Sequence, residues 1–343
     1  MIWDFWFCQG GLCSLVWALV GKMFEKRIKE LSKDFKNTSS EEFCILTNRD
    51  NLREIYFKNN KKAIDFIKIK FNSFPKRIVY FLIKIGLLQP FLKKIKLAEE
   101  FGDVVFVANS VKCFNLDKNT VLSLLRYKHL KKDFMDWANF KKKRGEEGYS
   151  PAVFSINKKI PFMTEELLEE YKGDDDIGVF KRIYSWYKER GFKKINSKKH
   201  IKFLAEKIRK KKVKSRFIEK LLSDLGKKDK DLIFSDLHGS FSKEQILMKD
   251  DSYVFIDWSD DAGFEKDLVI RDLASFFREE EDLLGNEDFS RLLKIYPAVV
   301  REDICFYLLL NELSSVARRG VFDFNIKRIK NILKHMKRSS CGE

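Results

Sequence analysis

Two aspartates follow short apolar runs within residues 232–261. Asp236 comes just after Leu232–Phe234, and Asp257 comes directly after Tyr253–Ile256. Carboxylates placed past the ends of neighbouring strands can converge on one point, where they repel each other unless a cation or a shared proton lies between them. The spacing therefore predicts a metal-assisted site.

The residues between the two aspartates predict a strand, a loop and a β-hairpin. A third apolar run, Gln245–Met248, precedes the turn at Asp250-Asp251-Ser252, and the run that ends before Asp257 follows it. Short apolar runs on either side of a polar turn are typical of a hairpin. The alternative is a buried hairpin with polar tips and no chemistry, because single motifs often mislead.

Four pieces of this region, in order, resemble the aminoglycoside phosphotransferase and choline kinase group, the small-molecule branch of the protein-kinase-like fold. The pieces are Ser235-Asp236-Leu237-His238, Gln245-Ile246-Leu247, Ile256-Asp257-Trp258 and Arg271-Asp272-Leu273-Ala274. The resemblance implies phosphoryl transfer from ATP, with Mg²⁺, to a hydroxyl group. It implies that Asp236 accepts the hydroxyl proton, and that Asp257 and Gln245 hold the metal.

The same resemblance gives two residues supporting roles and shows two departures. Asp272, at a helix start, would support the catalytic loop, and His238 would position that loop or touch substrate. The His-Gly that precedes the base in the family is Phe234-Ser235 here. The metal-binding asparagine is Gln245, displaced by an insertion within 239–244, and its longer side chain makes the Mg²⁺ geometry less certain.

The fold that the resemblance implies is α+β with two lobes, a small, mainly antiparallel N-lobe and an α-rich C-lobe. Strand patterns at 104–107, 111–116 and 121–127 and a helical pattern at 131–144 agree with the N-lobe. The expected domains are listed in chain order: 1–40, an apolar segment and linker; 41–100, a basic helical segment packing on the N-lobe; 101–170, the N-lobe and hinge; 171–343, the C-lobe with the catalytic loop and the metal-binding hairpin.

The nucleotide-binding parts of the N-lobe are altered in this sequence. Ser123 stands where the third strand should carry a lysine, so Arg126 or a lysine from elsewhere would hold the α- and β-phosphates. Asp136, or Asp133, would replace the ion-pairing glutamate of the helix. The remaining expectations are a phosphate-covering loop without glycine at 108–110 and an adenine-binding hinge that includes Glu165, Glu166 and Leu167.

Charge and cysteine content limit the function classes. Of 343 residues, 68 are Lys or Arg and 51 are Asp or Glu, a formal charge of +17 that favours anionic partners. The six cysteines are scattered without a metal-ligand or disulfide pattern, which favours a reducing cytoplasm. The basic run at 209–216 lacks aromatic interleaving and any nucleic-acid-binding motif, so nucleic acid is not expected as a partner.

Two segments leave a membrane association open. Residues 2–20 approach the length of a membrane span but contain Asp4, Gln9 and glycines; a membrane anchor, packing on the protein body and a native start at Met23 are the alternatives. Residues 61–97 alternate lysines with apolar residues and predict an amphipathic basic helix that ends at Gly86 and Pro90, with Ile78 and Phe81 on its apolar stripe. The favoured interpretation is packing on its own domain, and a membrane-surface helix is the alternative.

The sequence is compatible with an enzyme and with a pseudokinase. The altered lysine, asparagine and loop favour a pseudokinase, a nucleotide-binding or scaffold protein without turnover, whereas retention of Asp236 and Asp257 favours an enzyme. For an enzyme, the positive charge favours an anionic or neutral acceptor, such as a sugar or glycolipid, over a polycation. The sequence does not identify the acceptor or the oligomeric state.

Overall fold

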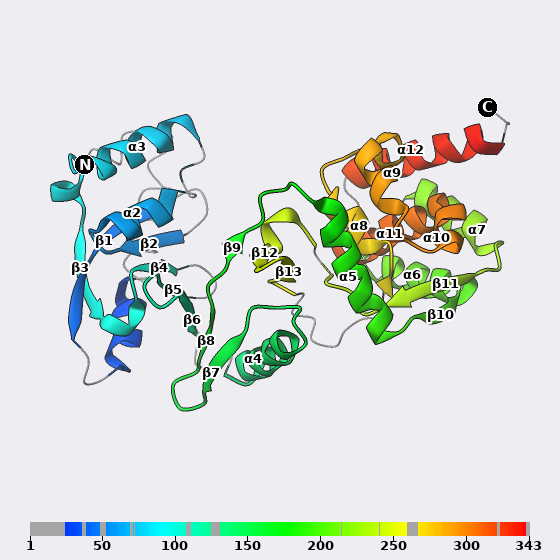
Figure 1. Cartoon of the computed structure of the whole chain (residues 1–343). Coiled ribbons are helices and arrows are strands. Elements are labelled where there is room, and N and C mark those ends of the chain that lie inside the picture. The colour runs from blue at the N-terminus through cyan, green and yellow to red at the C-terminus, as the bar shows by residue number, and fades with distance from the viewer. Residues whose placement is uncertain are drawn as a thin grey trace. The chain divides into compact units, whose positions relative to one another are not determined.

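The computed structural model describes eleven stretches of the chain. These are residues 25–35, 39–48, 53–68, 71, 73–107, 111–124, 131–213, 215–239, 241–258, 267–320 and 323–340. Arg126, the loop at 108–110 and residues 2–20 lie outside them. The chain divides into two compact units, Met1–Leu168 and Glu169–Glu343 (Figure 1).

Unit 1 is built on an eight-stranded antiparallel sheet in the order β3-β1-β2-β4-β5-β6-β8-β7. The strands are β1 (Ser40–Asn48), β2 (Arg53–Phe57), β3 (Lys94–Ala98), β4 (Val104–Val107), β5 (Val111–Asn115), β6 (Thr120–Leu124), β7 (Val153–Asn157) and β8 (Phe162–Glu166). Neighbours in sequence pair as hairpins at β4-β5, β5-β6 and β7-β8. The short polar turns in the sequence favour these connections.

Each face of this sheet has its own core, because successive side chains of a strand point to opposite faces. Tyr56 and Cys113 belong to the core on one face, which the helical segment 25–33 covers with Ile28 and Leu31. Phe57 belongs to the core on the other face, under α2 (Lys61–Ile67) and α3 (Phe74–Lys84). Short 3₁₀ helices, η3 (Gln89–Phe91) and η4 (Glu99–Phe101), flank β3.

The sequence predicts a basic helical segment over residues 41–100 that packs on the N-lobe. They contain α2 and α3, but also three strands that extend the sheet. In β3 the lysines alternate with buried Ile95 and Leu97, a period of two that only a strand can place on two faces.

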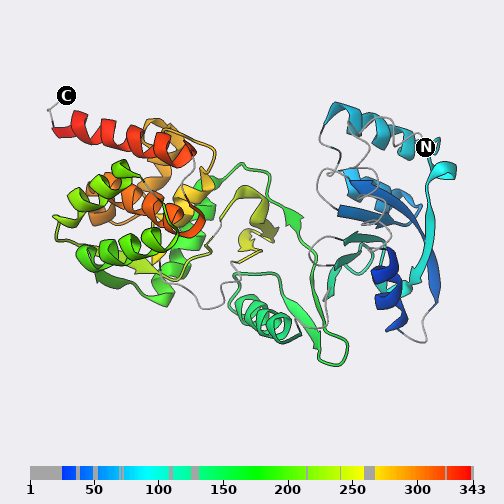
Figure 2. The ribbon, with the colours of Figure 1, turned by 180° about the vertical axis from the view of Figure 1, so that it is seen from behind.

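The helix α4 (Lys131–Glu146) completes unit 1 and packs on β7. Its Phe134 and Ala138 form a small core with Met163 of β8. Seen from behind, α4 lies beside the β7-β8 hairpin (Figure 2).

Unit 2 is mainly helical and contains two three-stranded sheets, β10-β11-β14 and β13-β12-β9. Its strands are β9 (Glu169–Glu170), β10 (Lys193–Asn196), β11 (Asp231–Ser235), β12 (Ile246–Lys249), β13 (Ser252–Phe255) and β14 (Asp267–Leu268). Its helices are α5 (Asp176–Arg190), α6 (Ser197–Lys210), α7 (Arg216–Gly226), α8 (Arg271–Phe276), α9 (Glu287–Leu293), α10 (Ala298–Glu302), α11 (Ile304–Arg319) and α12 (Asp323–Ser340), with 3₁₀ turns η6 (Lys243–Gln245) and η7 (Leu283–Gly285).

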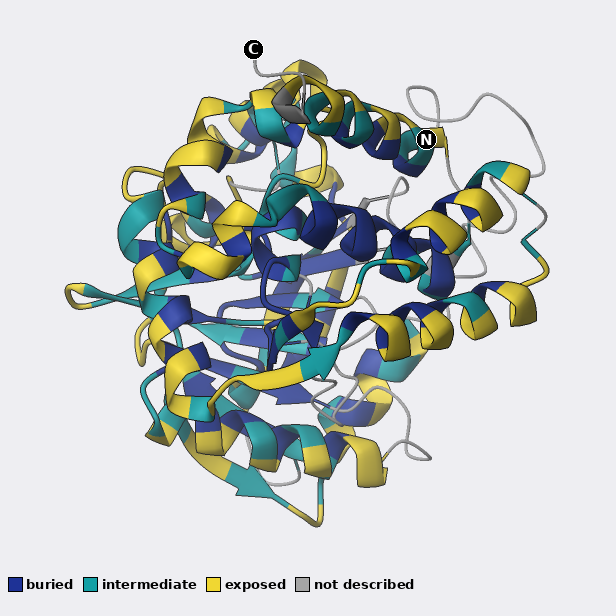
Figure 3. Cartoon of the chain, turned by 90° about the vertical axis from the view of Figure 1, so that its right-hand side faces the viewer, coloured by how far each residue is buried: buried dark blue, intermediate teal, exposed yellow. Residues whose placement is uncertain are grey.

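The centre of unit 2 is α11, in which every residue from 306 to 314 is buried. It packs against α6, α8, α10 and α12. Figure 3 shows buried residues on the inner sides of the helices and exposed residues on their outer sides. A helix that is buried all round must lie at the centre of its unit. The antiparallel sheet followed by a helix-rich region is the α+β arrangement that the sequence predicts. Among the described residues, no helix is long and apolar enough to cross a membrane.

Candidate active site

The loop after β11 is held by one buried carboxylate. Asp272, in the first turn of α8, accepts hydrogen bonds from the backbone N–H of His238 at 2.8 Å and of Gly239 at 2.9 Å, and from the Tyr187 hydroxyl at 2.6 Å. Burial, with Asp272 nearby, raises the pKa of Tyr187 well above its usual value, so its hydroxyl stays protonated and donates. Charge-assisted bonds of this kind fix the conformation of residues 236–239.

Ile256 joins that loop to the end of the hairpin. Its carbonyl oxygen lies 2.8 Å from Nε2 of His238, and its N–H donates to the Gln245 carbonyl at 2.9 Å. Asp236 is two residues from His238, and Asp257 is the next residue after Ile256. Two hydrogen bonds at one residue therefore bring the segments of Asp236, Gln245 and Asp257 together.

His238 is neutral where it makes this contact. A carbonyl oxygen only accepts, so Nε2 must carry the proton and donate. Burial lowers the pKa of His238, outweighing the opposing effects of Asp272 and the Ile256 contact. The ring packs against Phe241, Phe255 and Trp258. The ring therefore joins the loop after β11 to the end of the hairpin.

Asp257 differs from its neighbours in backbone and exposure. It is exposed and has φ +54°, in the left-handed region that side chains other than glycine rarely adopt. Residues held in such conformations cluster at ligand sites. The conformation ends the run of β13 and turns the chain directly after Ile256.

The oxygen donors in this region suit a hard cation. Mg²⁺ is usually bound by one or two protein oxygens and keeps several waters, and Asp257 with Gln245 supplies a carboxylate and an amide oxygen. Among the described residues, no group of three or more His, Cys, Asp or Glu side chains gathers to hold a metal. The donor set therefore fits Mg²⁺ shared with a ligand better than a metal bound by protein alone.

In unit 1 the strand position that lacks a lysine lies beside a buried ion pair. Ser123 donates from Oγ to Oε1 of Glu165 at 3.5 Å, and Oε2 of Glu165 pairs with Nζ of Lys141. The side chains of Lys141 and Glu165 are 3% and 6% exposed. The Lys141 ammonium also lies 5.0 Å from the centre of the Trp137 ring. A lysine ammonium therefore lies beside Ser123, but the lysine belongs to α4 and not to the strand.

The helix α4 corrects the expectation for its acidic residues. Asp136 and Asp133 are exposed, and the buried charged side chains of α4 are Lys141 and Arg144, of which Lys141 pairs with Glu165 of the sheet. The reason is the helical period, since Phe134, Ala138 and Lys141 recur at spacings of four and three. That spacing in the sequence could have identified Lys141.

Two of the residues expected at the hinge, Glu166 and Leu167, have their backbone N–H groups engaged. The N–H of Glu166 donates to the Ala152 carbonyl, and the N–H of Leu167 donates to the Asn119 carbonyl, both at 2.9 Å. Glu165 is committed to Lys141 through its side chain. In this structure neither amide can donate to an adenine ring, which departs from the expected role of the hinge.

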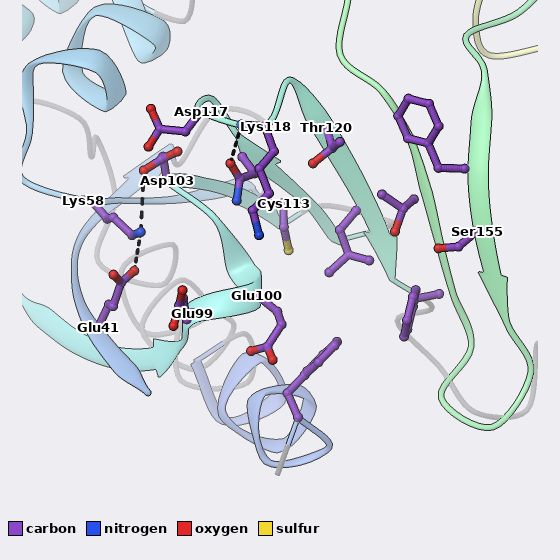
Figure 4. Close-up of a pocket in the computed structure, with 16 residues that line it drawn as sticks. Glu41, Lys58, Glu99, Glu100, Asp103, Cys113, Asp117, Lys118, Thr120 and Ser155 are labelled. Carbon is purple, nitrogen blue, oxygen red and sulfur yellow. Dashed lines mark hydrogen bonds and ion pairs between the residues drawn. The ribbon is translucent and has the colours of Figure 1, made fainter. Parts of the chain in front are cut away.

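Unit 1 contains a hollow of about 850 Å³ (Figure 4). Thr120, Leu122 and Thr164 line it, and these alternate along β6 and β8 with Ser123 and Glu165. Carboxylates dominate its rim, and Lys58 pairs there with Glu41 and with Asp103. The hollow is separate from the position that lacks the strand lysine.

Comparisons with known proteins give distant structural matches. No protein-family model matches the chain, and no curated protein matches it. The choline kinase LicA from Streptococcus pneumoniae is 15% identical, covering 67% of this chain and 90% of that one, with a TM-score of 0.38. A glucosamine kinase in complex with glucosamine, ADP and inorganic phosphate is 11% identical, covering 68% and 80%, also at 0.38.

An aminoglycoside-3'-phosphotransferase of type VIII is a further match, 16% identical over 60% of this chain and 89% of that one, with a TM-score of 0.35. These structures are of the group that the motifs around Asp236 and Asp257 resemble. The matches are similarities of fold, and the substrates named are those of the matched proteins.

Proposed function

We propose that the protein transfers the γ-phosphoryl group of ATP, with Mg²⁺, to a hydroxyl group of a small molecule, a sugar or a glycolipid. The observation that carries the proposal is the pair of hydrogen bonds at Ile256, together with the support of Asp272. They hold the segments of Asp236 and Asp257 side by side. Phosphoryl transfer depends mostly on positioning and charge neutralisation, so a fixed pair of carboxylates can support it.

Each residue then has one role. Asp236 orients the acceptor hydroxyl and accepts its proton, and Asp257 and Gln245 hold the Mg²⁺. The metal, when bound, neutralises charge that develops on the phosphate oxygens. His238 and Asp272 keep the loop in place without touching substrate.

Lys141 is the residue that we assign to the nucleotide phosphates. It lies on the sheet face that carries Ser123, where the resemblance expects the cation, and it is held by Glu165. A buried ion pair is weak support for stability, because desolvation offsets the attraction. A role in binding accounts for a lysine that is kept inside unit 1. Arg126, the other candidate, lies outside the described residues.

The test separates the two aspartates. We expect Asp236→Ala to lower phosphotransfer about 100-fold or more while ATP and Mg²⁺ together still raise the melting temperature. Asp257→Ala should lose the part of that rise that requires Mg²⁺. The matched control is Asp251→Ala, an exposed aspartate in the hairpin turn, which should change neither. Equal activity of wild type and Asp236→Ala would refute the assignment of the base.

A second candidate function is a pseudokinase that binds nucleotide without turnover. Ser123 in the third-strand position and the engaged amides of Glu166 and Leu167 favour it. Stabilisation by ATP, with no phosphotransfer to any acceptor in a broad panel, is the result that would select it.

A further inference from the structure

The outer face of α3 is the largest apolar feature left exposed in unit 1. Four side chains along it, at spacings of four, three and four residues, point outward. Two more follow the helix. The six, which we call the α3 surface, are Phe74 (78% exposed), Ile78 (47%), Phe81 (57%), Ile85 (49%), Leu87 (60%) and Phe91 (71%). They are six of the ten large apolar side chains that are exposed in the described part of the chain.

This arrangement overturns the favoured interpretation of the sequence, in which the stripe of Ile78 and Phe81 packs on its own domain. The face that packs is the other one. Tyr80 and Ile83 are buried in the core under α2 and α3. The Tyr80 hydroxyl also donates to Oδ1 of Asp65 on α2 at 3.0 Å. The helix is therefore fixed by one apolar face while a second apolar face stays outside.

The chain segment that carries the α3 surface is basic, and three of its lysines pair with carboxylates from outside it: Lys84 with Asp65, Lys93 with Glu25 and Lys94 with Glu42. Residues 66–98 contain no Asp or Glu and eight basic residues, namely Lys68, Lys70, Lys76, Arg77, Lys84, Lys93, Lys94 and Lys96. Arg77 is exposed on α3 itself, and Lys84 is half-exposed beside Asp65, 3.3 Å away. An apolar stripe with a basic border complements a surface that is anionic outside and apolar beneath.

We propose that the α3 surface docks on an anionic lipid membrane, with the helix lying in the plane of the interface. At eleven residues, α3 is far shorter than the about 20 residues that a membrane-spanning helix needs. Phe74, Phe81 and Phe91 would enter the boundary between headgroups and acyl chains, and the basic residues would lie among the headgroups. Figure 1 shows α3 at the outer end of unit 1, beyond α2 from the strands.

The experiment is flotation of the full chain with vesicles of phosphatidylcholine, with or without phosphatidylglycerol. Wild type should bind the anionic vesicles, and raising the ionic strength should weaken binding. The variant Phe74→Ser/Phe81→Ser/Phe91→Ser should bind the anionic vesicles more weakly than wild type, by a factor of about ten at least. Its matched control replaces three exposed phenylalanines elsewhere, Phe154→Ser/Phe192→Ser/Phe203→Ser, and should bind like wild type.

A second variant addresses charge without touching apolar packing. Arg77→Glu should weaken anionic binding about fivefold or more, since one basic residue near such a surface contributes about that factor. If the triple variant fails to fold, Arg77→Glu still tests the proposal. If the folded triple variant and Arg77→Glu both bind the vesicles like wild type, the proposal is wrong. Another segment, such as residues 2–20, would then account for any vesicle binding.

Two other outcomes also overturn it. Equal binding to neutral vesicles would remove the anionic requirement. A concentration-dependent dimer that the triple variant abolishes, without vesicle binding by wild type, would show that a second copy of the chain covers the α3 surface. None of these outcomes depends on phosphotransfer, so failure here is distinct from failure of the proposed function.

Discussion

At the scale of single residues, Lys141 most directly connects structure to nucleotide binding. It is buried against Glu165, and Ser123 completes the group. If Lys141 contacts phosphates, Lys141→Met should weaken stabilisation by ATP and ADP about tenfold in apparent affinity. Stabilisation by adenosine, which has no phosphate, should be unchanged.

The matched rescue places a lysine on the strand. Ser123→Lys in the Lys141→Met background should restore much of the ATP effect, because the cation returns to the same face of β6. Thermal-shift titrations of all three proteins measure this. A purely structural Lys141 would instead lower the melting temperature without ligand and reduce the responses to ATP and adenosine alike.

His200 gives a pH dependence whose sign follows from its burial. Burial lowers the pKa of His200 below its ordinary 6.5; Asp267 opposes this and Arg318 adds to it. As pH falls through about 6.5, the unfolded chain takes up a proton that the folded chain does not. Stability must therefore fall on acidification, by at most about 1.4 kcal/mol per pH unit for this one group.

The measurement is urea unfolding at several pH values between about 7.5 and 5.5. His200→Gln should flatten the loss of stability toward acid relative to wild type. The buried His238 has a lowered pKa too, so part of the slope should remain in the variant. An identical slope in the two proteins would contradict the assignment to His200.

At the scale of elements, one buried ion pair fastens the last helix of unit 2 to the central one. Glu312 of α11 accepts from Arg328 at 3.0 Å and from Asn325 at 2.6 Å, both on α12. Arg328 also donates to the carbonyls of Glu280 and Phe277, each at 2.7 Å. The group joins three segments through one guanidinium.

Removing one partner leaves the other charge buried. Glu312→Ala should lower the free energy of unfolding by about 3–5 kcal/mol, measured by urea titration. Glu281→Ala removes an exposed pair with Lys327 and should cost no more than about 1 kcal/mol. A small effect of Glu312→Ala would show that water or a neighbour compensates for Arg328.

Element types were predictable wherever the hydrophobic period was clear. The hairpin predicted around Asp250 appears as β12 and β13, and the helix predicted at 131–144 appears as α4. Residues 94–98 were not predicted as a strand within the basic segment 41–100, because lysines alternate with apolar residues there over a stretch too short to separate the two periods. Pairing with β1 makes residues 94–98 a strand, and this long-range pairing cannot be seen in the local sequence.

The candidate site was predictable only as far as its motifs reach. The resemblance singled out Asp272, and the structure has hydrogen bonds to it from the N–H groups of His238 and Gly239; that this loop is catalytic stays a prediction. Helical spacing marks Lys141 as facing the sheet, but its partner Glu165 lies 24 positions away on another element, so no local pattern reveals the pair. The outward stripe of α3 was missed because amphipathicity does not tell which face is the covered one.

At the scale of the whole molecule, the formal charge of +17 bears on which acceptor reaches the site. A field of this sign repels polycations and attracts anions, over about 8 Å at physiological ionic strength. Docking of the α3 surface on an anionic membrane would bring the chain to acceptors held there. Both arguments favour an acceptor that is neutral or carries phosphate or carboxylate.

The prediction is a ranking by charge. In the presence of ATP and Mg²⁺, phosphosugars and neutral sugars should be phosphorylated with higher kcat/KM than choline or aminoglycosides. Raising the salt concentration should lower kcat/KM for anionic acceptors, leave neutral ones nearly unchanged and raise it for cationic ones, because screening weakens both attraction and repulsion. Neutral sugars serve as the internal control. Preferential turnover of aminoglycosides or choline would show that local carboxylates outweigh the field of the whole chain.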